Sequence, residues 1–151
     1  MKFVFNINTK IYVAGHKGLI GSAFVRYFKK NGYKNILLMD KCELNLFSRQ
    51  DTFNFFKENE PEVVIMAAGR VGGIIANRDF PFEFISDNLS IQVNLINAAH
   101  KYGTKKLIFF GSSCMYPKHS SKALKESQIF KGVLEQSSIA YATAKYSGIQ
   151  M

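Results

Sequence analysis

Several features typical of membrane, secreted or metal-binding proteins are missing from this 151-residue sequence. No stretch approaches the ~20 apolar residues that a transmembrane helix needs. The N-terminus has a short apolar patch but neither a long hydrophobic region nor a small-residue cleavage site, so no secretory signal is predicted. The two cysteines, Cys42 and Cys114, are too few for a disulfide framework and wrongly spaced for zinc. We therefore expect a cytoplasmic protein with no metal site and no membrane partner.

Acidic residues are also scarce, with 11 Asp and Glu against 20 Lys and Arg, which gives a formal net charge of +9. The lysines form small scattered groups and not one stripe. This distribution favours a lysine-rich solvated surface, which also suits anionic nucleotides, over a nucleic-acid footprint. A hydrophobic content of 47% indicates a globular chain, and the length is that of one domain.

Apolar runs of strand length alternate with segments of helical periodicity. Strands are predicted over 10–15, 35–40, 63–69 and 107–111, and helices over 19–31, 48–59, 82–101 and 138–151. Three of the strands are near-continuous apolar runs, which suit a parallel sheet covered on both faces. The order predicts an α/β fold: a doubly wound parallel Rossmann sheet with helices on both faces.

The predicted sheet is incomplete, because a Rossmann sheet usually continues with two more strands and none follows here. We expect residues 1–9 to be a disordered or β-prone N-terminal extension. Residues 10–151 then form a dinucleotide-binding Rossmann domain that is truncated before its last strands, with no substrate domain.

Three glycines, Gly15, Gly18 and Gly21, stand between the first predicted strand and the first predicted helix. In this spacing the first glycine allows a tight turn, the second lets the backbone approach a pyrophosphate, and the third allows close packing of helix on strand. The helix N-terminus presents free N–H groups to the phosphate. The strand before the loop and the helix after it favour a nucleotide site over a structural loop.

The residues that follow leave the choice of dinucleotide open. Asp40 ends the second predicted strand, where an acid would bind a ribose 2′-hydroxyl and favour NAD(H). Lys17 in the loop, or Lys41, could instead meet a 2′-phosphate and favour NADP(H).

Tyr141 and Lys145 are four residues apart, so on a helix both side chains lie on one face. An ammonium beside a phenol favours the phenolate, and we therefore expect Lys145 to lower the pKa of Tyr141. A serine hydroxyl that reaches the same substrate oxygen, from the element Gly111-Ser112-Ser113, would complete a site that moves a proton on and off a carbonyl or alcohol.

Four blocks of sequence carry a resemblance to a known family. They are Ala14-Gly15-His16-Lys17-Gly18, Glu43-Leu44-Asn45-Leu46, Arg70-Val71-Gly72-Gly73-Ile74-Ile75-Ala76-Asn77 and Gly111-Ser112-Ser113-Cys114-Met115-Tyr116-Pro117. With the strand end Ala67-Ala68-Gly69 and the Tyr141/Lys145 pair, the chain resembles the GDP-L-fucose synthases, which are extended short-chain dehydrogenases/reductases of the epimerase/dehydratase type. The resemblance covers essentially the whole chain after residue 10.

The resemblance implies an NADP(H)-dependent oxidoreductase and epimerase. Such enzymes epimerise GDP-4-keto-6-deoxy-D-mannose at C3 and C5 and then reduce the C4 ketone to give GDP-L-fucose. By this resemblance, Tyr141 is the proton donor to the C4 oxygen, and Ser112 donates a hydrogen bond to the same oxygen. Lys145 adjusts the pKa of Tyr141 and binds the nicotinamide ribose. Cys114 matches the epimerisation cysteine, which is sensible because the 4-keto group acidifies the neighbouring C–H bonds.

The resemblance also implies the remaining contacts. The cofactor-binding residues are Gly15, Lys17, Gly18, Leu19, Ile20, Gly21, Asp40, Lys41, Asn45, Leu46, Ala67, Ala68 and Lys145. The substrate-binding residues are Val71, Gly72, Gly73, Ser112, Ser113 and Cys114. Asn88 is either the family's helix asparagine, which orders a water near the active-site lysine, or a polar position on a long helix. A homodimer is implied, with the helices over 82–101 and 138–151 as candidates for its interface.

Family members are much longer, and their remaining part carries the epimerisation histidine and most of the GDP-sugar site. Two other interpretations therefore stay open. The chain could be another nucleotide-sugar epimerase or dehydratase, although Ser113-Cys114-Met115 lacks the acid typical of a dehydratase. It could also be a truncated dinucleotide-binding module without turnover.

Overall fold

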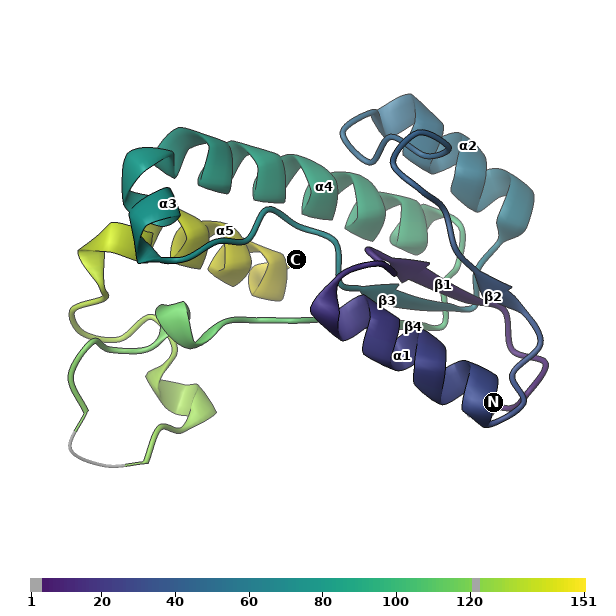
Figure 1. Ribbon diagram of the computed structural model, residues 1–151, viewed down its shortest axis with the longest axis horizontal. Helices are drawn as coiled ribbons and strands as arrows, with labels where there is room; N and C mark the ends of the chain where they lie inside the picture. The colour runs from purple at the N-terminus through teal and green to yellow at the C-terminus, as the bar shows by residue number, and fades with distance from the viewer. Residues whose placement is uncertain (1–3, 121–122) are drawn as a thin grey trace. The chain divides into compact units, whose positions relative to one another are not determined.

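The computed structural model describes residues 4–120 and 123–151 (Figure 1). In chain order the elements are β1 (Ile11–Ala14), α1 (Leu19–Lys30), β2 (Ile36–Leu37), α2 (Arg49–Asn59), β3 (Val63–Met66), α3 (Ile74–Asp79), α4 (Pro81–Lys101), β4 (Lys106–Phe109), the 3₁₀ helices η1 (Ser113–Met115), η2 (Glu126–Gln128) and η3 (Gln136–Ser138), and α5 (Ile139–Gln150). Each predicted strand and helix is present, so the alternating pattern is confirmed.

The four strands form one sheet in the order β2-β1-β3-β4, and every neighbouring pair is parallel. In the register, Ile11 of β1 lies between Ile36 of β2 and Val63 of β3. The predicted strand over 35–40 shrinks to two residues, because β2 is an edge strand and pairs with only the first half of β1. The parallel α/β sheet expected from the sequence is therefore observed.

Both faces of the central strands are buried, since β1 and β3 expose at most 2% of any side chain. On one face the strands share a cluster with α2 and the second half of α4: Tyr12, Ala14, Leu44, Phe55, Phe56, Val64, Met66, Ile91, Leu95, Ala98 and Ala99. Helix α1 lies on the opposite side of the sheet from α2 (Figure 1). Full burial on two faces explains why these strands are continuous apolar runs and do not alternate.

Local signals in the sequence fix the helix ends. The Ser48 hydroxyl accepts a hydrogen bond from the backbone N–H of Asp51 at 3.1 Å and so caps α2. Helix α1 ends at Lys30 with Asn31 as its C-cap, and the following Gly32 has a φ of +74° that favours glycine. Both features match the boundaries predicted from the sequence.

The N-terminal segment contains no strand in its described part, residues 4–9. Residues 1–3 lie outside the described part of the chain, whereas residues 4–9 form a turn in which the N–H of Thr9 donates to the carbonyl of Asn6 at 3.0 Å. The Phe5 ring packs against Tyr33, with centroids 5.1 Å apart. The described part of this segment is therefore linked to the residues that follow α1 by a contact between two partly exposed rings.

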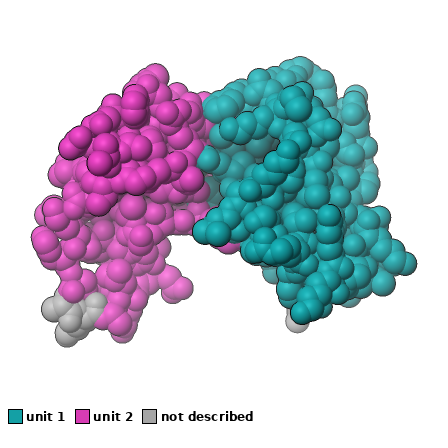
Figure 2. Space-filling model, viewed as in Figure 1, with its two compact units in different colours: residues 1–69, 91–109 teal, residues 70–90, 110–151 magenta. Residues whose placement is uncertain are grey.

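Two compact units divide the chain, and Figure 2 colours them separately. Unit 1 comprises residues 1–69 and 91–109 and holds the sheet, while unit 2 comprises residues 70–90 and 110–151. In unit 2 the sequence missed α3 and the three 3₁₀ helices, because each is too short for a periodic pattern to stand out. Among the described residues, no helix combines the length and apolarity needed to cross a bilayer.

Candidate functional site

The glycine loop of unit 1 has the backbone geometry of a phosphate cradle. Gly15 has a φ of +79°, and a Cβ there would lie 2.7 Å from the backbone nitrogen of Ala68. A Cβ on Gly21 would lie 2.2 Å from the carbonyl oxygen of Gly15, so both positions require glycine. Gly18 is the N-cap of α1 and no side chain caps this end, which leaves the N–H groups of the first turn for an anion.

Asp40 lies in the loop after β2 and has two partners. Its carboxylate pairs with Lys17, with Nζ and Oδ2 2.6 Å apart, and His16 Nε2 lies 3.3 Å from Oδ1. The hydrogen bond from Lys17 lowers the pKa of Asp40 and raises the pKa of the lysine. The two residues that gave opposite cofactor signals in the sequence are therefore partners.

The other cofactor candidates of unit 1 lie in different settings. Ala67 and Ala68 adjoin Gly15, as the close approach of its Cβ position shows. Leu19 is 89% exposed on the first turn of α1. Asn45 accepts a hydrogen bond from the N–H of Phe47, and the carbonyl of Leu46 accepts one from Asn94. Ile20 and Lys41 are exposed.

In unit 2, α5 places Tyr141 and Lys145 one turn apart on the same face. The lysine Nζ lies 5.8 Å from the centroid of the tyrosine ring, and the lysine side chain is 7% exposed. Burial of the ammonium lowers the pKa of Lys145. The spacing of four therefore brings the two groups together as the sequence predicts.

The expected effect on the phenol is wrong in direction. The pKa of Tyr141 is raised, first because burial disfavours the phenolate and second because of the charge of a Cys114 thiolate. The ammonium lies towards the face of the ring, and this does not offset desolvation of the phenol. Tyr141 is therefore a protonated group at neutral pH, which suits a proton donor.

Ser112 and Cys114 belong to the turn that follows β4. The Ser112 hydroxyl oxygen accepts a hydrogen bond from the N–H of Cys114 at 3.2 Å and caps η1. Its O–H is still able to donate to a second acceptor, such as a substrate oxygen. Cys114 is half-buried and carries a free thiol.

A cavity of about 390 Å³ lies within unit 2. Its lining residues are Gly72, Gly73, Ile74, Asn77, Ser113, Cys114, Tyr116, Pro117, Lys118, Glu135, Ser137 and Ser138. Four of the predicted substrate residues are thus brought together, whereas Val71, Ser112, Tyr141 and Lys145 are not part of this lining.

The cavity also contains polar residues to which the sequence analysis assigned no role. Lys118 Nζ and Glu135 Oε2 form an ion pair at 2.9 Å, and the hydrogen bond from this lysine lowers the pKa of Glu135. Asn77 is 6% exposed and donates to the carbonyls of Gly72 and Gly73, while its Oδ1 has no partner. In the sequence, Lys118 and Glu135 are indistinguishable from ordinary charged surface residues. The only sequence feature that indicated a role for Asn77 was the Gly72-Gly73 element close to it.

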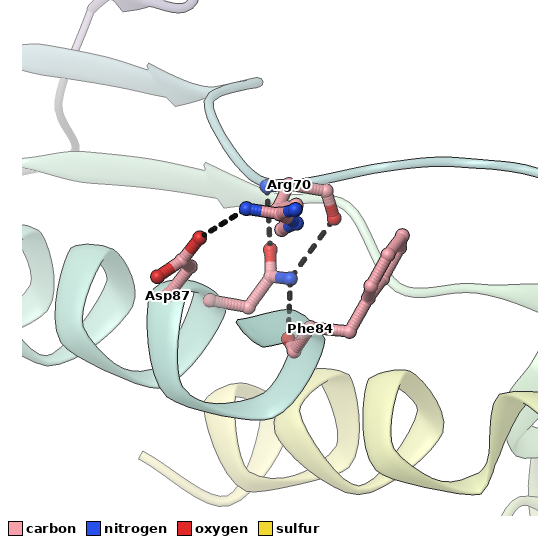
Figure 3. A network of polar contacts seen from close by, with 4 residues as sticks. Arg70, Phe84 and Asp87 are labelled. Atoms are coloured by element: carbon pink, nitrogen blue, oxygen red, sulfur yellow. Dashed lines mark hydrogen bonds and ion pairs between the residues drawn. The ribbon is translucent and has the colours of Figure 1, made fainter. Parts of the chain in front are cut away.

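Asn88 is a structural clamp in this chain, because its amide group binds the backbones of Arg70 and Phe84, which Figure 3 labels. Its Oδ1 accepts from the N–H of Arg70 at 3.1 Å, and its Nδ2 donates to the carbonyls of Arg70 and Phe84 at 2.9 and 2.7 Å. Both amide protons are therefore used by the backbone. Of the two interpretations of Asn88, this geometry favours a structural position over an asparagine that orders water.

Comparisons with known proteins agree with these local features. The sequence profile of the NAD dependent epimerase/dehydratase family matches residues 11–151. The chain is 46% identical over 143 residues to GDP-L-fucose synthase 1 of Arabidopsis thaliana, covering 95% of this chain and 44% of that protein.

Solved structures show the same fold. A GDP-mannoheptose C4 reductase from Campylobacter jejuni with NADP bound has a TM-score of 0.91 and 41% identity, covering 96% of this chain and 46% of the other. A GDP-L-fucose synthetase from Naegleria fowleri bound to NADP has a TM-score of 0.86 and 27% identity, covering 98% and 48%. This chain therefore spans less than half the length of the relatives it matches.

Proposed function

The chain belongs to the NAD dependent epimerase/dehydratase family, and from that premise we propose that its residues serve the reaction of a GDP-L-fucose synthase. The reaction is the NADPH-dependent 3,5-epimerisation and 4-reduction of GDP-4-keto-6-deoxy-D-mannose to GDP-L-fucose. The observation that carries the proposal is the grouping in unit 2, where Cys114 lines the cavity with Gly72 and Gly73 and its charge acts on Tyr141. A base for C–H groups and an acid for an oxygen thus belong to one unit.

The residues of the glycine loop fit a dinucleotide. A Cβ at Gly15 or Gly21 would collide with backbone, and the first turn of α1 has no side-chain cap. When bound, NADPH supplies the hydride for the reduction. Gly15, Gly18 and the first turn of α1 would hold the pyrophosphate, and we assign Lys145 to the nicotinamide ribose.

We assign NADP(H) as the cofactor, because Lys17 already neutralises the acid that would favour NAD(H). Asp40 accepts a 2.6 Å hydrogen bond from Lys17, so its carboxylate is engaged, and Lys41 lies exposed beside it. Similar proteins from Campylobacter jejuni and Naegleria fowleri have NADP bound, which supports the assignment.

Each catalytic side chain is assigned one role in the reaction. Cys114 Sγ removes the protons at C3 and C5 of the keto-sugar, which the C4 ketone acidifies, and a second acid must return a proton on the opposite face for each centre to invert. Tyr141 Oη then donates its proton to the C4 oxygen, and Ser112 Oγ donates a hydrogen bond to the same oxygen. The raised pKa of Tyr141 keeps that proton in place until the reduction needs it.

The first experiment titrates the purified chain with NADPH and NADH, by fluorescence and by thermal shift. Saturable binding that prefers NADPH, lost in Gly21→Ala, supports the dinucleotide site. Binding of neither nucleotide would show that the chain only shares ancestry with the family.

The second experiment incubates the chain with NADPH and the 4-keto sugar in D₂O. Deuterium at C3 and C5 that disappears in Cys114→Ser, and reduction that disappears in Tyr141→Phe, would support both steps. Nucleotide binding without either step supports a dinucleotide-binding module without turnover instead.

A second candidate is a GDP-sugar C4 reductase without epimerisation, favoured by the 41% identity to the GDP-mannoheptose C4 reductase. The same D₂O experiment separates the two, because a simple reductase incorporates no deuterium at C3 or C5. The proposal also includes a GDP-sugar substrate, a homodimer through α4 and α5, and a cytoplasmic location. Light scattering tests the dimer.

A further inference from the structure

Phe84 of helix α4 lies between the candidate substrate loop and the candidate proton donor, all within unit 2. Its side chain is 2% exposed. Neither its sequence context nor the assigned roles of its neighbours give it a task in the reaction.

On the loop side, Phe84 meets Arg70 and Gly72. The Arg70 guanidinium lies over the ring, 5.6 Å from its centroid, and pairs with Asp87 at 3.0 Å (Figure 3). A Cβ on Gly72 would lie 2.9 Å from Cζ of Phe84 and 3.1 Å from Cβ of Ala76, so the loop backbone runs close to the tip of the ring. Asn88 fixes this arrangement by holding both backbone polar groups of Arg70 and the carbonyl of Phe84.

On the other side, Phe84 packs edge to face against Tyr141, with centroids 6.1 Å apart and an angle of 85° between the rings. Edge-to-face pairs have a preferred geometry, and the buried Phe84 ring is packed without free space against the partly buried Tyr141. A displacement of the Phe84 ring is therefore transmitted to the phenol.

We propose that Phe84 is a positioning residue whose ring couples the loop of residues 70–73 to the phenol of Tyr141. The loop supplies Gly72 and Gly73 to the cavity, so a ligand that moves the loop also moves the proton donor. The description of Tyr141 as the donor rests on the proposed function, whereas the coupling itself does not. Placement matters, because a shift of about 1 Å in a reacting group can cost on the order of 100-fold in rate.

A matched pair of glycine variants tests the coupling without any need for turnover. The intact chain is labelled with ¹³C-tyrosine, and the resonances of Tyr141 among the seven tyrosines are identified by their loss in Tyr141→Phe. Gly72→Ala, whose methyl meets the Phe84 ring, is expected to shift the Tyr141 ring resonances. Gly73→Ala is the control, because its added Cβ has no neighbour within 4 Å, and it is expected to leave them unchanged.

A double-mutant cycle then asks whether the effect passes through Phe84. Arg70→Met removes the cation over the ring and is expected to shift the Tyr141 resonances in the wild-type background. In the Phe84→Leu background the same substitution is expected to have no effect on them. Phe84→Met, which keeps more of the volume, replaces Phe84→Leu if that variant loses its cooperative melting transition.

Equal responses to Gly72→Ala and Gly73→Ala would overturn the proposal. The proposal would also be overturned if Arg70→Met still shifted the Tyr141 resonances in the Phe84→Leu background, because the effect would then not pass through Phe84. If neither Phe84 variant folds, the comparison of Gly72→Ala with Gly73→Ala tests the proposal by itself. A coupled Tyr141 in a chain that binds no nucleotide would defeat the proposed function and leave this inference standing.

Discussion

Unit 1 and unit 2 of this chain are stabilised in different ways. In unit 1 the sheet, α2 and the second half of α4 share one cluster of eleven buried residues. In unit 2 the corresponding cluster consists of Met115, Leu134 and Ala142, surrounded by half-buried side chains that include Cys114. The nucleotide loop thus stands on a rigid apolar support, whereas the residues assigned to catalysis lie among polar contacts.

Polar contacts stabilise unit 2 to a larger extent than unit 1, where apolar packing dominates. Asn88 holds the backbone of Arg70, and an ion pair joins Lys118 to Glu135. Exposed ion pairs contribute only about 0–1 kcal/mol each, so unit 2 is expected to open at a lower free energy than unit 1. A catalytic group needs polar neighbours and access to its substrate, and both reduce the apolar area that can be buried.

The largest test of this contrast truncates one buried side chain in each unit. Phe56→Ala, at a fully buried position of the unit 1 cluster, should lower the free energy of unfolding by about 3–5 kcal/mol. Met115→Ala in unit 2 should cost about 2 kcal/mol, because its smaller cluster has more room to relax. Urea denaturation followed by circular dichroism measures both, and equal losses would contradict the contrast.

The next test separates the packing of the glycine loop from its binding. In Gly21→Ala the new methyl would lie 2.2 Å from the carbonyl oxygen of Gly15, and we expect a loss of about 3 kcal/mol together with all nucleotide binding. Gly18→Ala is the control, since its Cβ would meet the same oxygen at 3.4 Å, an ordinary contact. It should fold normally and bind NADPH more weakly. Normal melting of Gly21→Ala would contradict the steric argument.

A smaller effect of opposite sign is expected in unit 2. Lys145→Met replaces a buried ammonium by an apolar side chain and should stabilise the chain by about 1 kcal/mol, while it abolishes reduction. Burial lowers the pKa of Lys145 from its ordinary 10.5, so just below that pH the unfolded chain binds more protons than the folded one. The stability of the wild type relative to the variant therefore rises with pH in that window. Thermal melts at neutral and alkaline pH measure the difference, and a destabilised Lys145→Met chain would refute it.

The smallest effect concerns the titration of Tyr141. Cys114→Ser removes the thiolate charge that raises the pKa of the phenol, and so it should lower that pKa and leave burial as the remaining cause of the shift. The ¹³C-tyrosine signal followed against pH reports the change, with Cys42→Ser as the control, since Cys42 is an exposed thiol of unit 1. An unchanged titration would mean that the two groups do not interact.

The sequence predicted unit 1 well and unit 2 less completely. The runs that became β1 and β3 are apolar on both faces, and Ser48 and Gly32 marked helix ends, so local chemistry sufficed there. In unit 2 the short helix α3 and the 3₁₀ helices have no periodic pattern, and tertiary contacts decide their conformation. Asn77 and Glu135 joined the cavity for the same reason.

By itself, the sequence determined the parallel sheet, the glycine loop and the pairing of Tyr141 with Lys145, because each depends on spacing along one strand, turn or helix. The tertiary structure decided the direction of the Tyr141 pKa, the engagement of Asp40 by Lys17 and the use of Asn88 as a clamp. These properties depend on burial and on partners up to 27 residues away. The desolvation of a side chain and its pairing with a distant residue depend on tertiary packing. A local sequence pattern therefore cannot predict them.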